Sequence, residues 1–233
     1  MSTVAIIPAR GGSKGLKEKN IYPVASKPLL AWTILQALAS TSIDKVFVST
    51  DDQAIADVAI EYGAEVIVRP PELAGDKASS ESAILHALGV IESEYEIPVS
   101  MIVFLQATSP LRKPGDIDGA VDVFRRQEAD SLISVTKADD LTLWESREGK
   151  WTSVNFDYRN RGMRQDRPTQ FIENGSIYIF TPDTLAAFGN RIGDKLSVYE
   201  MEFWQTLEID TVEEIDLIEY YLYKKNLAVQ VAH

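Results

Sequence analysis

A glycine-rich loop with basic residues follows the first apolar run of the sequence. The run VAIIP, residues 4–8, leads directly into ARGGSKG, and Lys19 follows shortly after. Glycine lets backbone N–H groups approach an anion closely and tolerates positive φ, while arginine and lysine add full positive charge. We therefore expect Arg10, Lys14 and Lys19 to serve a polyphosphate. The spacing fits neither the P-loop nor the GxGxxG pattern of dinucleotide sites.

A pair of carboxylates, Glu208 and Asp210, stands near the end of the chain in the segment LEID. We predict a strand over WQTLEID, so that residues i and i+2 share a face and both carboxylates can converge on one ion. Mg²⁺ prefers oxygen ligands and binds through one or two carboxylates plus substrate phosphates. The pair therefore indicates a magnesium site, and the competing interpretation is two solvated strand charges.

A cluster of arginines occupies the segment YRNRGMRQDR, which contains Arg159, Arg161, Arg164 and Arg167. An arginine can hold a carboxylate through two parallel hydrogen bonds. The formal net charge of the chain is −12, so an acidic ligand would be repelled unless cations were placed near it. The arginines of the cluster either bind such an acidic ligand or form the solvated surface of an arm.

Composition limits the class of protein. The 233 residues are 45% hydrophobic and 25% charged, which is typical of a globular domain. The acidic balance disfavours nucleic-acid binding, which needs a basic face. Cysteine is absent from the sequence, which excludes disulfides and thiolate sites. Because we find neither a signal peptide nor an apolar run near the ~18 residues of a membrane span, we expect a cytoplasmic protein without membrane contact.

Short apolar runs alternate with amphipathic segments along the first part of the chain. Val- and Ile-rich runs predict strands over residues 4–8, 45–49, 65–68, 101–105 and 131–135. The segments between them predict helices over residues 26–40 (with a cap near Ser26), 51–62, 79–93 and 115–127. This alternation is typical of an α/β fold with a largely parallel sheet. Ligands bind at the carboxyl ends of such strands, which places ARGGSKG, STDD and QATSPLR at one rim.

The pattern changes in the second part of the chain. Residues 139–167 carry two tryptophans and show no sustained period, so we interpret them as an excursion from a single domain that spans 1–233, serving as a lid or as a subunit-contact arm. Strand-like segments return with GSIYIF and WQTLEID, and a last helix follows over 212–226 with acids at its start and lysines at its end.

Five blocks of the sequence, in order, resemble those of the cytidylyltransferases that activate nine-carbon acidic sugars, the CMP-sialic acid synthetases. The blocks are PARGGSKGLKEKNI, STDDQAIADVAIEYGAEVIVRPPELAGDKASS, FLQATSPLR, RQDRPTQFIENGSIYIF and LEIDTVEEID. The resemblance covers nearly the whole chain. It implies a Rossmann-like nucleotidyltransferase fold, and an attack by the anomeric hydroxyl of a 2-keto-3-deoxy sugar acid on the α-phosphorus of CTP, with release of pyrophosphate.

The resemblance also assigns roles to individual residues. Arg10 and Lys14, with Lys19, would stabilise charge on the leaving pyrophosphate. The nucleotide contacts that it implies fall on Ala9, Arg10, Gly11, Ser13, Lys14, Asn20, Arg69 and Ser80. Taken alone, Asn20 could equally be a turn residue, Arg69 a strand-end charge, and Ser80 a helix cap.

The sugar side and the metal are assigned in the same way. The resemblance implies sugar contacts, or residues that brace them, at Gln106, Arg164, Gln165, Asn174 and Tyr178. The family usually shows aspartate at both metal positions, so Asp210 is the safer Mg²⁺ ligand and the role of Glu208 is open. The family's bacterial enzymes often carry a basic residue just before the NG step, where this chain has Ile172 and Glu173.

Several interpretations remain open from the sequence. The substrate could be a related acidic sugar, such as legionaminic, pseudaminic or deoxyoctulosonic acid. A sugar-1-phosphate nucleotidyltransferase fits less well, because such enzymes usually have a longer glycine-rich first loop. A nucleotide-binding module without turnover is the alternative from another class. The resemblance further implies a homodimer built through the excursion.

Overall fold

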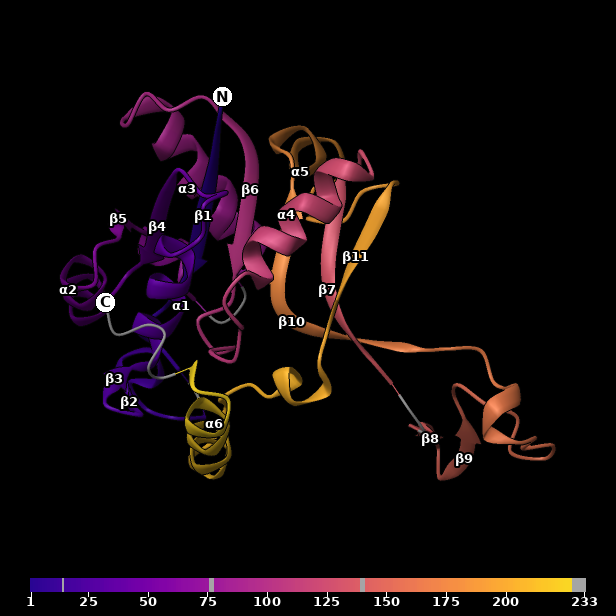
Figure 1. The fold of residues 1–233 in the computed structure, drawn as a ribbon. Helices are drawn as coiled ribbons and strands as arrows, with labels where there is room; N and C mark the ends of the chain where they lie inside the picture. Colours follow the sequence, from indigo (N-terminus) through magenta and orange to yellow (C-terminus); the bar gives the residue numbers. More distant parts are fainter. Residues whose placement is uncertain (14, 76–77, 139–140, 228–233) are drawn as a thin grey trace.

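The computed structural model describes residues 1–13, 15–75, 78–138 and 141–227. Of Arg164, within the last range, it describes the backbone and not the side chain. A seven-stranded sheet forms its centre, with the strand order β11-β7-β10-β6-β1-β4-β5 (Figure 1). The strands are β1 (Ser2–Pro8), β4 (Lys45–Thr50), β5 (Glu65–Val68), β6 (Val99–Leu105), β7 (Ser131–Lys137), β10 (Phe171–Phe180) and β11 (Leu196–Met201).

The predicted, mostly parallel sheet is confirmed. β1, β4, β5 and β6 pair in parallel, as do β7 and β11, and within the described residues β10 is antiparallel to both of its neighbours. All five strands predicted in the first part of the chain are present. β10 begins four residues earlier than the predicted segment GSIYIF, and β11 was not predicted.

Helices cover both faces of the sheet (Figure 1). They are α1 (Leu29–Leu38), α2 (Gln53–Glu61), α3 (Ser80–Ser93), α4 (Asp116–Arg126), α5 (Pro182–Phe188) and α6 (Val212–Lys224). Ala5 and Ile7 of β1 pack in one apolar cluster with α1, α2 and α4, whereas Val4 and Ile6 pack in a second cluster with α3 and α5. The alternation follows from the two-residue repeat of a strand, and both faces are buried because helices lie on each.

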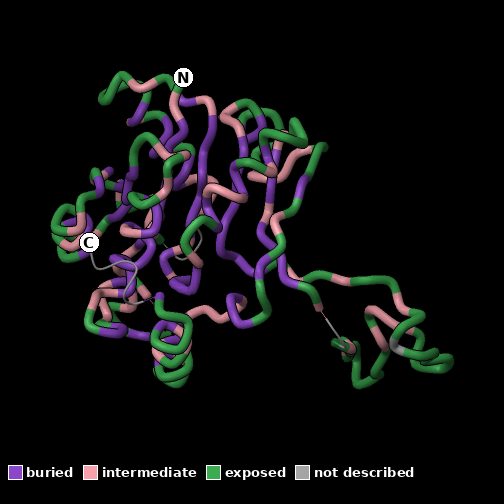
Figure 2. Tube along the Cα trace, in the orientation of Figure 1, coloured by how far each residue is buried: buried purple, intermediate pink, exposed green. Residues whose placement is uncertain are grey.

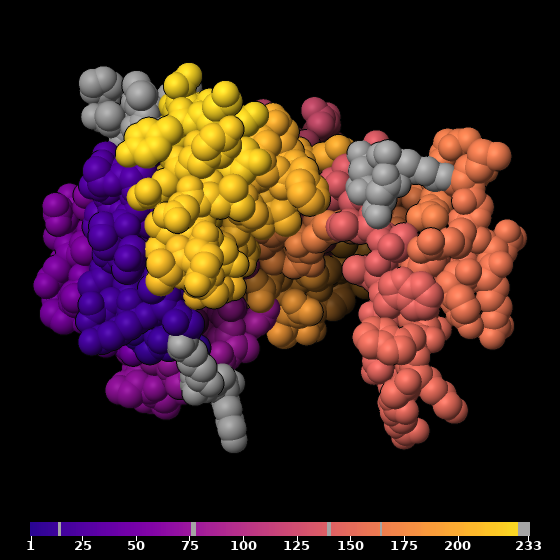
Figure 3. Space-filling view, turned by 90° about the horizontal axis from the view of Figure 1, so that it is seen from below, coloured from indigo at the N-terminus to yellow at the C-terminus, as the bar shows by residue number. Residues whose placement is uncertain are grey.

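A third apolar cluster joins the first loop to the C-terminal helix. Leu16 and Trp32 pack there with Ile209, Ile215 and other residues of α6, and Trp32 Nε1 donates to the carbonyl of Val24. The space-filling view shows the yellow C-terminal segment against the indigo N-terminal one (Figure 3). This cluster brings the glycine-rich loop and the LEID segment to the same place.

Two local predictions are wrong. Ser26 does not cap α1: it lies at φ 72 in the tight turn between β2 (Pro23–Val24) and β3 (Lys27–Pro28), and Pro28 precedes the first helical residue. The predicted strand WQTLEID is instead a 3₁₀ turn over Phe203–Thr206 followed by an extended segment outside the sheet. Trp204 there packs in the third cluster, against residues of α6 and not against the sheet.

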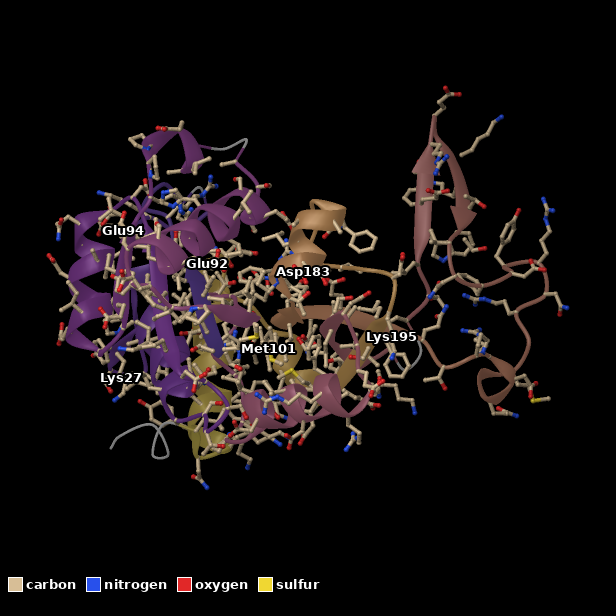
Figure 4. The ribbon with its side chains drawn as sticks, turned by 90° about the horizontal axis from the view of Figure 1, so that it is seen from above. Lys27, Glu92, Glu94, Met101, Asp183 and Lys195 are labelled. Atoms are coloured by element: carbon tan, nitrogen blue, oxygen red, sulfur yellow. The ribbon has the colours of Figure 1, made fainter. Side chains whose placement is uncertain are left out.

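The predicted excursion projects away from the sheet (Figures 1 and 4). Its described part, residues 141–169, is called the arm below; it contains the hairpin β8 (Trp144–Arg147) and β9 (Lys150–Ser153) and a 3₁₀ turn over Arg164–Asp166. The arm is mostly exposed, in contrast to the buried central strands (Figure 2). Separately, none of the described helices is both long and apolar enough to cross a bilayer.

Candidate active site

A cleft lies at the carboxyl ends of β1 and β6, where the strand order reverses. From β1 the chain proceeds to β4 and β5 on one side and then returns to β6 on the other. Such switch points form the ligand crevice of open α/β sheets. We call this the first cleft; it has a volume of about 320 Å³ and is open to solvent. Its lining includes Pro8, Arg10, Ser13, Gly15, Lys19, Asn20, Ser80, Phe104, Gln106, Ala107, Thr108 and Asp210.

The loop glycines are required for close approach rather than for positive φ. None of Gly11, Gly12 and Gly15 is among the described glycines with positive φ. A Cβ on Gly11 would lie 2.6 Å from the Asp52 carboxylate, and a Cβ on Gly15 would lie 2.4 Å from the carbonyl oxygen of Asp210. A Cβ on Gly12 would meet nothing within 4 Å. Close packing therefore explains two of the loop glycines, Gly11 and Gly15.

Side chains after β4 organise the loop. Asp52 caps α2 by accepting from the amide of Ile55, as a helix N-cap does. Asp51 does not cap the helix: its carboxylate accepts from the amide of Gly11 at 3.1 Å. This bond ties the loop to the neighbouring strand, and it occupies an amide that was predicted to contact the nucleotide.

Residues at the two ends of the chain meet in the first cleft. Lys19 Nζ lies 2.8 Å from Asp210 Oδ1, and its side chain is only 15% exposed. Asn20 is buried and its Nδ2 donates to the carbonyl of Arg10 at 3.0 Å, so it shapes the loop from behind. Ser80 stands at the first turn of α3 and lines the cleft, while its neighbour Ser79 accepts from the amide of Ser82 and is the cap.

Arg69 is predicted to contact the nucleotide, but it is absent from the described lining of the first cleft. It is buried, and its guanidinium donates to Ser49 Oγ at 3.1 Å and to the Ser49 carbonyl at 2.6 Å. Burial lowers the pKa of Arg69, and the nearby charge of Arg10 lowers it further while that of Asp51 raises it. Arg69 therefore braces the end of β4 through Ser49 and is not part of the described cleft lining.

A second cleft adjoins the first along β10. Its lining includes Glu173, Asn174, Gly175, Tyr178, Thr206, Leu207, Glu208 and Glu214. Asn174 is buried and shares hydrogen bonds with Ser134 and Thr136 of β7, and Tyr178 donates to Glu173 at 2.5 Å. Burial and the Glu173 carboxylate raise the pKa of Tyr178. Because β10 runs antiparallel, its first residues reach the same rim as the ends of the parallel strands.

Gly175 lies at the boundary between the clefts. It has φ +69, and a Cβ there would lie 2.2 Å from Glu208 Oε1 and 2.7 Å from Gln106 Nε2. Any larger residue would therefore collide with two residues that have predicted roles. The NG step of the sequence signals a turn, but neither the antiparallel strand around it nor this packing was predicted.

The Glu208–Asp210 pair fits a magnesium ion bound with substrate phosphates. Burial raises the pKa of Glu208, the bond from Ser109 Oγ to Glu208 Oε1 at 3.2 Å opposes this, and the nearby Asp210 carboxylate raises the pKa further. Among the described residues no group of three or more acidic or histidine side chains could hold a metal, so substrate or water would complete the coordination.

Some predicted residues are not brought to the clefts. Gln165 lies on the exposed arm, where its Nε2 contacts Met163 Sδ at 3.1 Å. Lys14 and the side chain of Arg164 lie outside the described residues. Sequence reasoning missed Phe104 and Thr108 of the cleft lining, and it missed Arg112, which is buried behind it. The block FLQATSPLR was the available signal for all three.

The arrangement suits the transfer of a nucleotidyl group. The basic residues Arg10 and Lys19 gather at the first cleft, where a polyphosphate would need them. Two carboxylates stand between this cleft and a second, polar one that could hold an acceptor. Two adjoining clefts suit a bimolecular displacement, which requires two reactants held side by side.

The comparisons with known proteins agree with this geometry. The family model "Cytidylyltransferase" matches residues 4–227. The N-acylneuraminate cytidylyltransferase A of Danio rerio is 37% identical over 209 residues, which are 88% of this chain and 47% of that protein. The post-translational flagellin modification protein B of Campylobacter coli is 32% identical over 94% of each chain. This chain spans about half the length of the first curated relatives it matches.

A solved structure shares the fold. A CMP-2-keto-3-deoxy-manno-octonic acid synthetase complexed with CTP superposes with a TM-score of 0.73, over 97% of this chain and 100% of that one, at 15% sequence identity. The sheet is thus that of a Rossmann-like nucleotidyltransferase. Together with the family model and the relatives above 30% identity, it shows that the chain belongs to the cytidylyltransferase family.

Proposed function

We propose that the chain transfers CMP from CTP to the anomeric hydroxyl of a nine-carbon 2-keto-3-deoxy sugar acid of the N-acylneuraminate type, with release of pyrophosphate. The observation that carries the proposal is the pair of adjoining clefts, a basic one at the switch point and a polar one along β10, which meet at Glu208 and Gly175. The names of the relatives from Danio rerio and other organisms support the substrate class.

The reaction is an in-line displacement. The anomeric oxygen forms a bond to the α-phosphorus of CTP, the bond from that phosphorus to the bridging oxygen of pyrophosphate breaks, and the hydroxyl proton is released. Arg10, Lys14 and Lys19 would stabilise the charge that develops on the leaving group. Asn20 and Ser80 would hold the nucleotide, while Gln106, Asn174 and Tyr178 would hold or brace the sugar.

We also propose that Mg²⁺ serves the reaction, bound by Asp210 with Glu208 as the second carboxylate. When bound, the ion would neutralise charge on the phosphates. The present contact between Lys19 and Asp210 keeps a cation beside the carboxylate at the position where phosphate oxygens are expected. Glu208, one methylene longer than aspartate, reaches toward Gly175 and Gln106.

A cytoplasmic homodimer is the assembly we propose. The arm exposes large apolar side chains, as a surface intended for contact does. They are Leu143, Trp144, Trp151, Val154, Tyr158 and Met163. A partner subunit placed against the arm would cover them.

Pyrophosphate release from CTP with a panel of 2-keto sugar acids tests the function. We expect release with a nine-carbon acid and magnesium, and little release when UTP replaces CTP. A preference for legionaminic or pseudaminic acid would keep the chemistry and change the substrate. A chain that binds CTP but releases no pyrophosphate with any acid would contradict the proposal.

A further inference from the structure

We infer that Arg112 is a positioning residue of this transfer, and that its guanidinium fixes the distance between the first cleft and the second. Arg112 follows β6 in the segment PLR and is only 1% exposed. It touches neither cleft opening among the described lining residues. The inference rests on the proposed function, because it concerns how the two substrates are aligned.

The contacts of Arg112 lie where β6 and β10 separate. The paired register of these strands ends with Leu105 opposite Ile177. The next residues would be Gln106 and Ser176, and Arg112 Nη2 donates to the carbonyl of each, at 2.9 Å and 2.7 Å. One guanidinium nitrogen therefore joins the residue after β6 to a residue inside β10, at the point where the ladder between these two strands stops.

The other nitrogen of the fork anchors this link to a helix. Arg112 Nη1 donates to Thr33 Oγ1 and Gln36 Oε1 of α1, both at 3.1 Å. Gln36 Nε2 in turn donates to the carbonyl of Pro110 at 2.7 Å. The guanidinium plane is thus held from two sides, which fixes its orientation as well as its position.

The link reaches both clefts through adjacent residues. Gln106 lines the first cleft, and Ser176 follows Asn174 and Gly175 of the second. The space between them is tight, because Gln106 Nε2 and Glu208 Oε1 would both collide with a Cβ on Gly175. A shift of one strand end against the other would therefore change the distance between the two bound substrates.

The cost of burying Arg112 supports a role beyond packing. No carboxylate among the described residues forms an ion pair with it, and its Nε has no hydrogen-bond partner there. Burial lowers the pKa of Arg112 to about 9, although the charges of Asp116 and Glu208 act in the other direction. An apolar side chain would fill the same space at lower cost. What an apolar side chain lacks is a rigid fork that binds two carbonyls with one nitrogen and two side chains of α1 with the other.

The test compares Arg112→Lys and Arg112→Met with a matched control, Gln205→Met. Gln205 is also 1% exposed, and its Nε2 donates to the Leu111 carbonyl at 2.9 Å and to Asp116 at 2.7 Å. The control therefore loses these two buried hydrogen bonds close to Arg112, and also the bond that Gln205 Oε1 accepts from the Glu202 amide, without touching the residues that line the clefts. Steady-state kinetics with CTP and the sugar acid are measured beside the melting temperature of each variant.

We expect both Arg112 variants to lower kcat by about 30- to 100-fold, since misplacement of reactants by about 1 Å costs rate on that scale. The KM values for CTP and for the sugar acid should stay within about twofold, since neither substrate loses a direct contact. Gln205→Met should lower the melting temperature by a similar amount and leave kcat within about twofold of the wild type.

Chemical rescue of kcat by an added small cation separates a positioning role of Arg112 from a purely structural one. Arg112 lines a pocket between α1 and α4, with Gln36, Lys113 and Gly115, through which a small cation could enter. Millimolar guanidinium should raise the kcat of Arg112→Ala by about tenfold or more, whereas urea or ammonium should not, because only guanidinium restores the fork.

Three outcomes would overturn the inference. One is an Arg112→Lys variant with wild-type kcat. Another is a Gln205→Met variant whose kcat falls as far as that of Arg112→Met. If neither Arg112 variant folds, Thr33→Val is assayed instead. The third outcome is then an unchanged kcat of this Thr33→Val variant. An inactive wild type would contradict the proposed function itself, whereas an active wild type with equally active variants contradicts this inference alone.

Discussion

At the residue scale, the contact between Lys19 and Asp210 connects the charges that the reaction needs. Their charged atoms lie 2.8 Å apart, although the residues are 191 positions apart in sequence. Lys19 is largely buried and Asp210 is exposed. A lysine held in this way is ordered before a phosphate arrives, which lowers the reorganisation that binding and reaction require.

Lys19→Met should lower kcat by about 10²- to 10³-fold, the usual effect of removing one preorganised charge at a transition state. The control is Lys17→Met, since the Lys17 side chain is 92% exposed and contacts only Glu18 at 3.9 Å among the described ion pairs. Circular dichroism checks that both variants fold. Equal activity of the two variants would remove Lys19 from the site.

The metal requirement should depend more on Asp210 than on Glu208. Asp210→Asn should raise the magnesium concentration for half-maximal activity by more than Glu208→Gln does, because Asp210 is exposed at the first cleft while Glu208 is half-buried and bonded to Ser109. The measurement is a magnesium titration at saturating CTP. A larger effect of Glu208→Gln would reverse the two roles.

At the element scale, the antiparallel strand β10 determines how the two clefts adjoin. Its first half carries Glu173, Asn174 and Gly175, and it brings them to the rim at which β1 and β6 end. The register between β7 and β10 shifts between Glu173 and Tyr178, where Gly175 adopts positive φ. The second cleft is therefore a product of an irregular strand, unlike the first, which follows from regular parallel ones.

Gly175→Ala should abolish most activity, and Gly189→Ala is the matched control. Both glycines have positive φ, +69 and +59, so alanine costs each about 1 kcal/mol of stability through backbone strain. A Cβ at Gly189 meets nothing within 4 Å, whereas one at Gly175 collides with Glu208 and Gln106. Melting temperatures and kcat are compared for the two variants. If the two variants lose activity equally, the collision at Gly175 does not affect catalysis.

Regular elements could be predicted from the sequence where burial alone decides them. Residues 2–105 contain the parallel strands β1, β4, β5 and β6; the Val- and Ile-rich runs of β1, β4 and β6 are covered on both faces by helices and so remain continuous, whereas the edge strand β5 leaves Val68 exposed. β11 was missed because Leu196 and Val198 are exposed while Ser197 is buried, which inverts the usual alternation. The segment after Met201 was predicted as a strand because it is apolar, but its apolar residues pack against α6 and not in the sheet.

The candidate site could be predicted in composition but not in contacts. Short blocks of sequence indicated Arg10, Lys19, Gln106 and Asp210, and all four line the first cleft. The sequence could not show that Asp51 bonds to the Gly11 amide, or that Arg112 joins two carbonyls, because such bonds depend on the distance between strands that are remote in sequence. Tertiary packing decides them.

At the scale of the whole molecule, the arm is attached to the sheet by two adjacent strands. β7 ends at Lys137 and β10 begins at Phe171, and these two residues are cross-strand partners. The Ala138 amide also donates to the Gln170 carbonyl at 2.8 Å. The arm can therefore be removed without separating the strands that carry it.

Replacement of residues 139–169 by Asn-Gly should give a folded monomer. Asn-Gly favours the two-residue turn that joins antiparallel strands, and Ala138 and Gln170 are already paired. Light scattering should report a dimer for the wild type and a monomer for the variant, with far-UV circular dichroism checking the fold. A wild type that is monomeric at micromolar concentration, or a shortened variant that stays dimeric, would refute the proposed role of the arm.

The meeting of Lys19 with Asp210 has a consequence for the order of events during synthesis. The glycine-rich loop leaves the ribosome early, but the carbonyl that packs against Gly15 and the carboxylate that pairs with Lys19 both belong to residue 210. Because chains emerge from the N-terminus and domains fold as they appear, a nascent chain can form β1, β4 and β6 well before the first cleft is complete. Nucleotide binding should therefore begin abruptly, once residue 210 has been translated, rather than increase gradually with chain length.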